Sequence, residues 1–360
     1  MRSVQKKQPI RQARGVALVT ALLIVSLATI MAVSLMSRQY LDVRRTGNIM
    51  LSDQAYLYSL AMENFAGQLL AYYRDKGQSE FDNRADFEAA LLQFSAFPVD
   101  GGTVSVNVSY PEAMFNVNSL IKEDGSPDEK QRMRYRRLLT SVIEDLGSVD
   151  ASVDNLVDAL IDWIDPNQET HGGAEDGTYE SKDVPYKTAD RMMSSISELR
   201  LVEGYSHELL YGFPGDEDNE PIAGLLSYVT ALPDRNTKLN VNLVTEAKQF
   251  FALSTHIDED MSEGLVVDDA PYENVADFKG SEIFDSVDDT DPPAQQGGES
   301  DRDELYSDIS DMYSVQSHYF LLRGVATVGQ ARIDLNSLIY VAENGKKLEV
   351  ISRSIGTVGI

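Results

Sequence analysis

The side chains best suited to chemistry are concentrated in one acidic stretch, "DWIDPNQETHGGAEDGTYESKDVPY", between Asp162 and Tyr186. Calcium prefers six to eight oxygen ligands, drawn from carboxylates, side-chain amides and loop carbonyls. Glycines allow sharp bends, so a loop that leaves an acidic helix end can turn several oxygens toward one point. The stretch places such oxygens around Gly172, Gly173 and Gly177, on Asp162, Asp165, Asn167, Glu169, Glu175, Asp176 and Asp183. The pattern favours a calcium site.

Other interpretations of the same stretch stay open at this point. Acidic helix ends and loops are often only solvated, and the spacing differs from that of an EF-hand calcium loop. A carboxylate pair, either Asp162 with Asp165 or Glu175 with Asp176, is also what a glycosidase uses. That alternative would make the protein a membrane-anchored periplasmic hydrolase. His171 stands without the cysteines or the second histidine of a typical zinc site.

The acidic stretch must be positioned by the helices around it. "SVDNLVDALIDWID" begins with serine, a typical N-cap, and carries apolar residues at helical spacing. The preceding "DEKQRMRYRRLLTSVIEDLG" is amphipathic and should end at Gly147. The sequence is mostly helical from about Asp128 to Leu253, with short helices expected in "SSISELRLVEGY" and "VTEAKQFFAL". Trp163, the only tryptophan, is expected to pack inside this helical region.

Strand patterns occur on both sides of the helical region. "GGTVSVNVSY" alternates valines with polar residues, which predicts a strand, and "AMFNVNSL" is expected to complete a hairpin with it. After Tyr313, "SVQSHYFLLRGVATVGQARIDLNSLIYVAENGKKLEVISRS" predicts a three-stranded meander. In "MFNVNSL", "KLNVNLV" and "RIDLNSL", a shared asparagine is expected to cap the turn after a strand. Residues 285–304 are too polar and too rich in glycine and proline to pack, so we expect a disordered loop.

The N-terminal region predicts a membrane helix. Val16 to Met36 has no charge, glycine or proline and is long enough to cross a bilayer. The first fifteen residues contain five basic residues and no acidic residue, which favours a cytoplasmic N-terminus. The helix should continue, amphipathic, to about Arg74. A cleaved secretory signal would have a shorter apolar core, whereas an ordinary signal anchor fits both length and charge.

Gly15 adds a third interpretation of this region. A basic leader that ends in glycine just before an apolar helix resembles the class III signal of type IV pilins and pseudopilins. In that class a prepilin peptidase cuts on the cytoplasmic side and the apolar helix stays in the mature protein. The cut would fall between Gly15 and Val16.

Composition narrows the functions further. The 360 residues have a formal charge of −27, which argues against binding to nucleic acid phosphates and against a DNA-binding role for "LPDRNTKLNVNLVTEA". The chain has no cysteine, so it forms neither disulfides nor thiolate zinc sites. In an oxidising periplasm, a bound cation is one way to fix loops that no disulfide holds.

Several segments in the same order resemble the K-type minor pseudopilins of type II secretion systems. They are the Gly15–Val16 leader, the strand followed by "FNVNSL", "DWIDPNQE" with "GAEDGTY" and "VPY", "SELRLVEGY", and "VTALPDRNTKLNVNLVTEA". The resemblance implies an α+β pseudopilin fold with a long N-terminal transmembrane helix, an antiparallel sheet and a large inserted α-helical domain. It implies a non-enzymatic subunit of the inner membrane with its C-terminal domain in the periplasm.

The resemblance also implies a domain layout, a metal and partners. The expected segments are a leader (1–15), a transmembrane helix (16–36), a helical spine with the first strands (37–118), an inserted α-domain (119–255), an acidic, partly disordered segment (256–312) and C-terminal strands (313–360). Carried onto this sequence, the calcium ligands are Asp162, Asp165, Asn167, Glu169, Glu175 and Asp176. The implied partners are the I-type and J-type minor pseudopilins at the pseudopilus tip, the major pseudopilin, exported proteins and the prepilin peptidase.

One position in the membrane helix bears on the place of the subunit in the assembly. Most pilins carry a glutamate at the fifth mature position, where it pairs with the N-terminal amine of a neighbour. Counted from Val16, that position is Thr20, which cannot form the ion pair. An unpaired charge in a membrane costs several kcal/mol. A subunit that no other subunit follows needs no such glutamate, so the resemblance implies a tip position.

Overall fold

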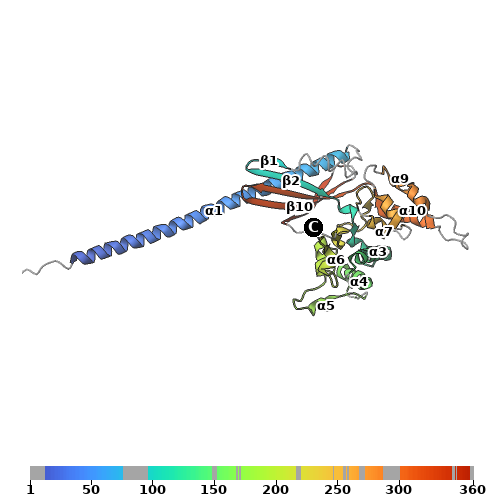
Figure 1. Ribbon diagram of the computed structural model, residues 1–360, viewed down its shortest axis with the longest axis horizontal. Coiled ribbons are helices and arrows are strands. Elements are labelled where there is room, and N and C mark those ends of the chain that lie inside the picture. The colour runs from blue at the N-terminus through green and yellow to red at the C-terminus, as the bar shows by residue number, and fades with distance from the viewer. Residues whose placement is uncertain are drawn as a thin grey trace, which may run out of the picture.

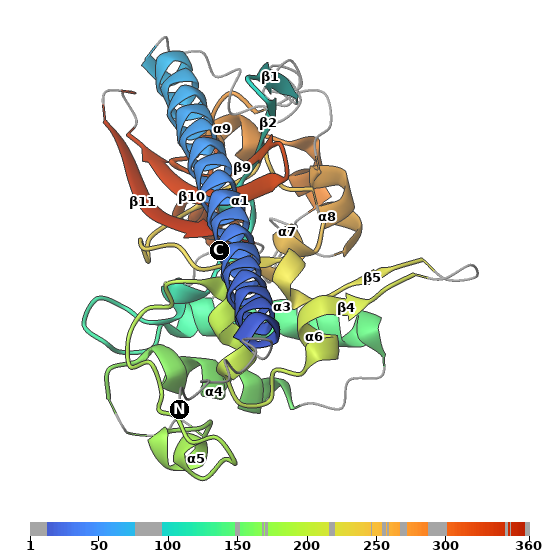
Figure 2. The same cartoon turned by 90° about the vertical axis from the view of Figure 1, so that its left-hand side faces the viewer.

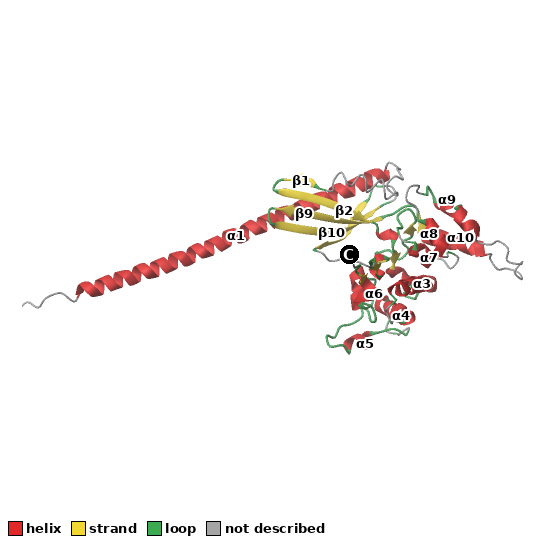
Figure 3. Ribbon diagram, viewed as in Figure 1, coloured by secondary structure: helices red, strands yellow, loops and turns green. Residues whose placement is uncertain are grey.

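The chain forms a long helix that carries a sheet and, beside it, a helical lobe (Figure 1). The computed structural model describes residues 13–75, 96–147, 152–167, 169, 172–215, 220–245, 247–253, 257, 259–266, 272–286, 301–342, 345 and 347–356. Strands gather along the second half of the long helix, and most of the other helices lie in the lobe (Figure 3). The predicted α+β class with a separate helical domain is confirmed.

Helix α1 runs unbroken from Ala13 to Asp75, 63 residues, and confirms the predicted end near Arg74. Its most apolar 18-residue window has a mean hydropathy of 2.7 and none of that window is buried in the protein. Among the described residues, α1 is the one helix long and apolar enough to cross a membrane. The second half has a buried face formed by Ala55, Met62, Ala66, Leu70 and Ala71.

The buried face of α1 lies across a five-stranded antiparallel sheet (Figure 2). The strand order is β1-β2-β9-β10-β11, with β1 at Phe97–Val99, β2 at Gly102–Ser109, β9 at Tyr319–Val328, β10 at Ala331–Val341 and β11 at Leu348–Ile355. The predicted meander of the last three strands is confirmed. In β2 the valines at 104, 106 and 108 are buried, and they pack with Phe320, Leu322 and Ile339 beneath α1.

The predicted hairpin between "GGTVSVNVSY" and "AMFNVNSL" is wrong. Strand β2 pairs with β1 and β9 instead. The short strand β3 (Phe115–Asn116) runs parallel to β6 (Val229–Thr230) in the helical lobe. Pro111 begins a 3-10 turn (Pro111–Ala113) directly after β2, and this turn directs the chain away from the sheet.

An ion pair fixes α1 to the sheet. Glu63, only 3% exposed, accepts hydrogen bonds from Arg353 of β11 at 2.7 and 2.8 Å and from the Ser337 hydroxyl of β10. Burial alone would raise the pKa of Glu63, but the hydrogen bonds from Arg353 and Ser337 outweigh burial and lower it. The register of α1 on the sheet is therefore set by charge as well as by apolar contact.

The helical lobe, called the α-domain below, contains most of the remaining elements. Its helices are α3 (Glu129–Leu146), α4 (Val153–Ile164), α5 (Asp176–Glu180), α6 (His207–Tyr211), α7 (Lys248–Leu253), α8 (Glu259–Leu265), α9 (Val275–Lys279) and α10 (Asp301–Met312). Its 3-10 turns are Val117–Leu120, Ile196–Leu201, Leu225–Ser227 and Glu282–Ser286, and its other short strands are β4 (Gly212–Phe213), β5 (Ile222–Ala223), β7 (Leu239–Asn240) and β8 (Tyr313–Ser314).

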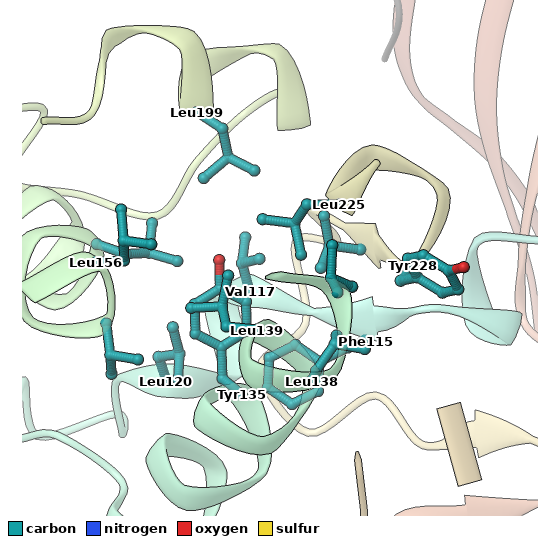
Figure 4. Packing of buried hydrophobic residues seen from close by; sticks show 14 of the residues in the cluster. Phe115, Val117, Leu120, Tyr135, Leu138, Leu139, Leu156, Leu199, Leu225 and Tyr228 are labelled. Carbon is teal, nitrogen blue, oxygen red and sulfur yellow. The ribbon is translucent and has the colours of Figure 1, made fainter. Parts of the chain in front are cut away.

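The predicted ends of α3 agree with its capping residues, whereas the predicted N-cap of α4, Ser152, stands at the N-cap position without a side-chain capping bond. Asp128 caps α3 by accepting hydrogen bonds from the backbone N–H groups of Lys130 and Gln131. Gly147 ends the helix with φ +61°, the left-handed conformation that glycine adopts easily. The apolar faces of α3 and α4 meet in one core (Figure 4), which includes Phe115, Val117, Leu120, Tyr135, Leu138, Leu139, Leu156, Leu199, Leu225 and Tyr228.

The α-domain core extends beyond the expected boundary at residue 255. Leu265, Phe278, Phe284, Leu305 and Ile309 belong to the same buried cluster as α3 and α4. Residues 287–300 of the expected loop lie outside the described residues, but Asp301 to Glu304 begin helix α10 rather than a loop. The prediction of a loop relied on the high acid content of this region and overlooked an apolar helix face. Leu305, Ile309 and Met312, spaced by four and three residues, lie on one side of the helix and are buried.

Two asparagine pairs hold the α-domain together in the same way. The side chain of Asn116 accepts from the backbone N–H of Asn118, and that of Asn240 accepts from Asn242. The side chain of the second asparagine of each pair forms hydrogen bonds with a residue distant in the chain. Asn118 binds the backbone N–H and C=O of Met193, and Asn242 binds both groups of Tyr272. The predicted capping role is confirmed for these two pairs, and the asparagines also join segments far apart in the chain. It is wrong for "RIDLNSL", because Asn336 lies within β10 and donates to the carbonyl of Gly356.

Replacing Asn118 is therefore expected to cost more stability than replacing Asn242. Asn118 is 0% exposed and makes a third side-chain bond, to the carbonyl of Leu232, whereas Asn242 is 8% exposed. Asn118→Ala should lower the free energy of unfolding by about 3 kcal/mol and Asn242→Ala by about 2 kcal/mol, because each buried group left unpaired costs about 1–3 kcal/mol. Urea titration followed by circular dichroism measures both, with the exposed Asn236→Ala as the control. Equal losses in all three variants would contradict the prediction.

Candidate functional site

The acidic site begins on α4. Leu156, Leu160 and Trp163 bury the apolar side of this helix. Asp162 and Asp165, three residues apart and therefore on one side of the helix, are both 0% exposed. Asp165 is the C-cap of α4, and its extended backbone (ψ 152°) starts the loop. The α4 end thus places two carboxylates inside the protein.

The second wall of the site is the returning loop. A β-carbon on Gly173 would lie 2.3 Å from the backbone nitrogen of Ala159, so only glycine lets the loop approach α4 this closely. Two residues later, both carboxylate oxygens of Glu175 are inaccessible to solvent and accept no hydrogen bond from the described residues. Trp163, 3% exposed, packs edge-on against Tyr179 with 5.3 Å between the ring centres, which confirms its predicted structural role.

The electrostatics of the site centre on Glu175. Burial, followed by the charges of Asp162, Asp165, Asp190 and Asp176, raises the pKa of Glu175 to about 7. Buried carboxylates are normally hydrogen-bonded or paired with a cation. Glu175 and its acidic neighbours therefore form a negatively charged cluster. No described side chain donates a hydrogen bond to Glu175 or neutralises its charge.

The other predicted ligands lie around this cluster. The side-chain amide of Asn167 donates to Asp165 at 2.9 Å, while its carbonyl oxygen accepts from the backbone N–H of Glu169 at 2.7 Å. The side chain of Glu169 is exposed. Asp176 accepts from Lys187 at 2.6 Å and from Thr188, and these bonds lower its pKa. Asp162, Asp165 and Glu175 thus come together, whereas Asn167 is bonded to Asp165, Asp176 is bonded to Lys187, and the side chain of Glu169 is exposed.

Asp190 is a member of the cluster that the sequence analysis missed. Its φ of +50° lies in the left-handed region, which aspartate tolerates better than most residues. Its backbone N–H donates to the carbonyl of Trp163 at 3.1 Å, and its carboxylate accepts from Thr188 at 2.5 Å. Asp190 follows the glycine-rich loop by more than a dozen residues, and no local pattern connects it with Glu175.

The cluster fits a hard cation such as calcium. Every candidate ligand offers oxygen, and Glu175 presents two buried acceptors without donors among the described residues. Within the described part of the chain, no three aspartate, glutamate or histidine side chains already stand in the arrangement of a complete metal centre. A cation bound here would be held by the carboxylates of Asp162, Asp165 and Glu175 and would neutralise their charge.

The same geometry argues against the hydrolase alternative. A carboxylic acid with a pKa near 7 is suited to general acid catalysis. A general acid must, however, contact its substrate. The carboxylate oxygens of Glu175 are inaccessible to solvent, so no substrate could reach them in this conformation.

The predicted processing site lies at the other end of the molecule. Gly15 is exposed near the start of α1, and a β-carbon added there would meet nothing within 4 Å. Val16 is also exposed, at 66%. The hydroxyl of Thr20 donates within its own helix, to the carbonyls of Val16 at 3.1 Å and Ala17 at 3.0 Å. Thr20 therefore needs no partner for its polar group in a membrane.

Comparison with known proteins agrees with this architecture. A sequence model of the family described as "Type II secretion system (T2SS), protein K" matches residues 113–212. Type II secretion system protein K of Pseudomonas aeruginosa is 31% identical over 97% of this chain and 95% of its own length. The protein of the same name from Aeromonas hydrophila is 29% identical over 96% of this chain and 98% of its own.

A solved structure has the same fold. It is the GspK-GspI-GspJ complex of the type 2 secretion system of enterotoxigenic Escherichia coli. The matching chain superposes with a TM-score of 0.65 at 21% identity and covers 87% of this chain and all of its own length. With near full-length similarity to several proteins K and a shared fold, this chain belongs to the type II secretion system protein K family, the K-type minor pseudopilins.

Proposed function

We propose that this protein is the terminal subunit of a type II secretion pseudopilus, assembled with I-type and J-type minor pseudopilins. Helix α1 anchors it in the inner membrane, and the sheet and α-domain lie in the periplasm. The leader up to Gly15 is removed by the prepilin peptidase. The related complex of GspK with GspI and GspJ supports this choice of partners. The major pseudopilin lies below this group, and exported proteins meet the outer end.

The observation that carries the terminal position is the polar chemistry of Thr20. Its hydroxyl is satisfied by Val16 and Ala17, so the membrane part of α1 has no buried charge that calls for a neighbour's amine. Ser26 and Thr29 likewise donate to carbonyls of the preceding turn. A subunit with this helix can be the first to enter the pseudopilus, because it needs no other subunit on its outer side.

The periplasmic half of α1 offers a surface for the partner helices. Val43, Met50 and Leu57 are 71%, 67% and 63% exposed, and they recur every seven residues. Seven-residue spacing places them in one stripe, away from the face that contacts the sheet. Apolar stripes of this kind pack against a second helix in water. The stripe therefore supports association with another pseudopilin outside the membrane.

The α-domain gives the subunit its width. It lies at the end of the sheet farthest from the apolar part of α1 and to one side of the helix (Figure 1). We include in the proposal that calcium, held by Asp162, Asp165, Glu175 and loop oxygens, stabilises this lobe. The buried, unpaired oxygens of Glu175 support that assignment.

Two aspartates in the stripe are expected to abolish assembly with the partners. The double variant Met50→Asp and Leu57→Asp places two negative charges where a partner helix would pack. Co-purification with the I-type and J-type pseudopilins should fall at least tenfold, since each desolvated charge costs several kcal/mol. Val184→Asp is the matched control, because Val184 is 77% exposed but belongs to the α-domain. Unchanged recovery of both partners with the double variant would remove the proposal.

A further inference from the structure

We propose that a basic cleft in the α-domain binds an acidic side chain on an extended segment of another protein. The cleft lies between the first turns of α3, the turn at 233–238 and the C-terminal end of α10. None of its lining residues belongs to the acidic site around Glu175. The proposal stands independently of the proposed function, because it depends on neither calcium nor the position of the subunit in the pseudopilus.

The cleft is rich in basic residues, although the protein as a whole is strongly acidic. The whole chain has 31 lysines and arginines against 58 aspartates and glutamates. The cleft, about 400 Å³ in volume, is lined by five cations and three acids. The cations are Lys122, Lys130, Arg134, Arg235 and Lys238, and the acids are Glu123, Asp128 and Asp311. Cations gathered against such a background indicate a site for a negative group.

Several of these side chains already have partners. Asp128 caps α3. Arg134 pairs with Asp308 at 3.0 Å, and Lys130 lies 3.9 Å from both Asp308 and Asp311. The ammonium of Lys238 donates to the carbonyl of Ser310 at 2.8 Å. These contacts fix the walls of the cleft and leave their cations with reduced capacity for a ligand.

Arg235 and Lys122 are the cations that remain available. Neither side chain forms an ion pair or hydrogen bond with the residues that the structure describes. The Nε–H of Arg235 is inaccessible to solvent and has no acceptor there. A buried donor of this kind is costly unless a ligand supplies the acceptor. The turn that carries Arg235 is held in place, because the carbonyl of Asp234 accepts from Asn116 at 2.7 Å and from Thr237 at 2.6 Å.

A carboxylate on a peptide fits the cleft better than a free anion. The planar guanidinium binds a carboxylate through two parallel hydrogen bonds. The three acids in the lining would repel a doubly charged phosphate more strongly than a single carboxylate. Met312, 8% exposed, provides an apolar contact for the methylene groups of a side chain, and the volume exceeds that of a small ion. The overall charge of −27 disfavours a strongly acidic peptide. The expected segment therefore carries one glutamate or aspartate among neutral or basic residues.

The test uses the full mature chain in detergent micelles and a blocked synthetic peptide with one glutamate between lysines, labelled for fluorescence anisotropy. We expect saturable binding to the wild type. Replacing the glutamate of the peptide by glutamine should weaken binding at least about tenfold, the factor for a lost charge-assisted hydrogen bond. Arg235→Gln should weaken binding by a similar factor, and Lys122→Gln by less.

The control variant is Arg323→Gln, which removes one exposed arginine from β9 on the sheet and should leave binding unchanged. All variants are checked for an unchanged melting temperature. Equal affinity of Arg235→Gln and Arg323→Gln would overturn the proposal, as would equal affinity for the two peptides or no saturable binding by the wild type. Displacement of the peptide by millimolar inorganic phosphate would also overturn it, because the cleft would then bind anions without requiring a side chain.

Discussion

Chelation of calcium is expected to lower the melting temperature of the mature protein by about 5–10 °C. Calcium about a hundredfold above its dissociation constant contributes about 2.7 kcal/mol to the folded state. One kcal/mol corresponds to about 2–4 °C for a domain of this size. Scanning calorimetry in calcium and then in excess EDTA measures the difference. Magnesium should not restore the loss, because it is smaller and prefers a rigid octahedral shell.

Glu175→Gln gives this prediction a distinctive signature. At pH 7.5 without calcium, the variant should melt above the wild type, because it removes one buried charge that four neighbouring aspartates repel. With calcium, the variant should melt below the wild type, because it has lost a ligand. A purely structural glutamate would destabilise the protein in both conditions when replaced. Gly173→Ala, which prevents the loop from reaching α4, should abolish the calcium response without the gain in EDTA.

The pH dependence follows from the same residue. The folded protein holds the Glu175 proton up to about pH 7, whereas the unfolded chain releases it near the ordinary glutamate pKa of 4.5. Between these values the folded state binds more protons, so stability should fall as the pH rises through this window. In EDTA, the difference in melting temperature between wild type and Glu175→Gln should therefore be small at pH 5 and largest at pH 8. A melting temperature indifferent to calcium at every pH would remove the metal from the proposal.

Gly15→Val is expected to leave the precursor uncleaved. Intact-protein mass spectrometry should find a chain longer by the fifteen leader residues, with all five of their basic side chains. No atom lies within 4 Å of the position that a β-carbon on Gly15 would take. The substitution should therefore leave the fold unchanged and act only on cleavage by the peptidase. Under the proposed function, an uncleaved subunit would keep five basic residues on its cytoplasmic side, and moving them through the membrane with the pseudopilus would be costly.

Gly47→Val is the matched control for this experiment. Gly47 also lies in α1 with nothing within 4 Å of an added β-carbon, but it is far from the leader. This variant should mature normally, with Val16 as its first residue. If Gly15→Val still matured at Val16, the class III signal would be wrong, whereas an ordinary signal anchor would leave even the wild type uncleaved.

The parts of the fold that could be predicted from the sequence are those with strong local periodicity. The apolar run after Gly15, the valines of β2 and the strands after Tyr313 each carry their own pattern, and the structure confirms them. The partner of "AMFNVNSL" could not be predicted this way, because β3 pairs with β6, more than a hundred residues later. Short parallel strands such as these depend on tertiary packing rather than on local signals.

The candidate site likewise has one part that local sequence predicts and one part that depends on tertiary structure. Asp162, Asp165 and Glu175 belong to one continuous stretch whose composition drew attention to it. Asp190 joins them only because its left-handed backbone and its bond to Trp163 turn the chain back toward α4. Composition also gave a wrong prediction for the acidic region near α10. There, burial of a few apolar residues at helical spacing is enough to fold a helix despite the many charges.

The junction at Ser317 has a mechanical consequence. Arg74, at the end of α1, donates to the Ser317 carbonyl, and Asn240 of the α-domain donates to its hydroxyl at 2.9 Å. A rod about 95 Å long thus ends at a residue that is also bonded to the lobe. A force applied along α1 would reach the α-domain in part through this joint, beside the bonds that Glu112 accepts from the backbone N–H groups of His318 and Tyr319. The α-domain should therefore move together with α1 instead of trailing behind it.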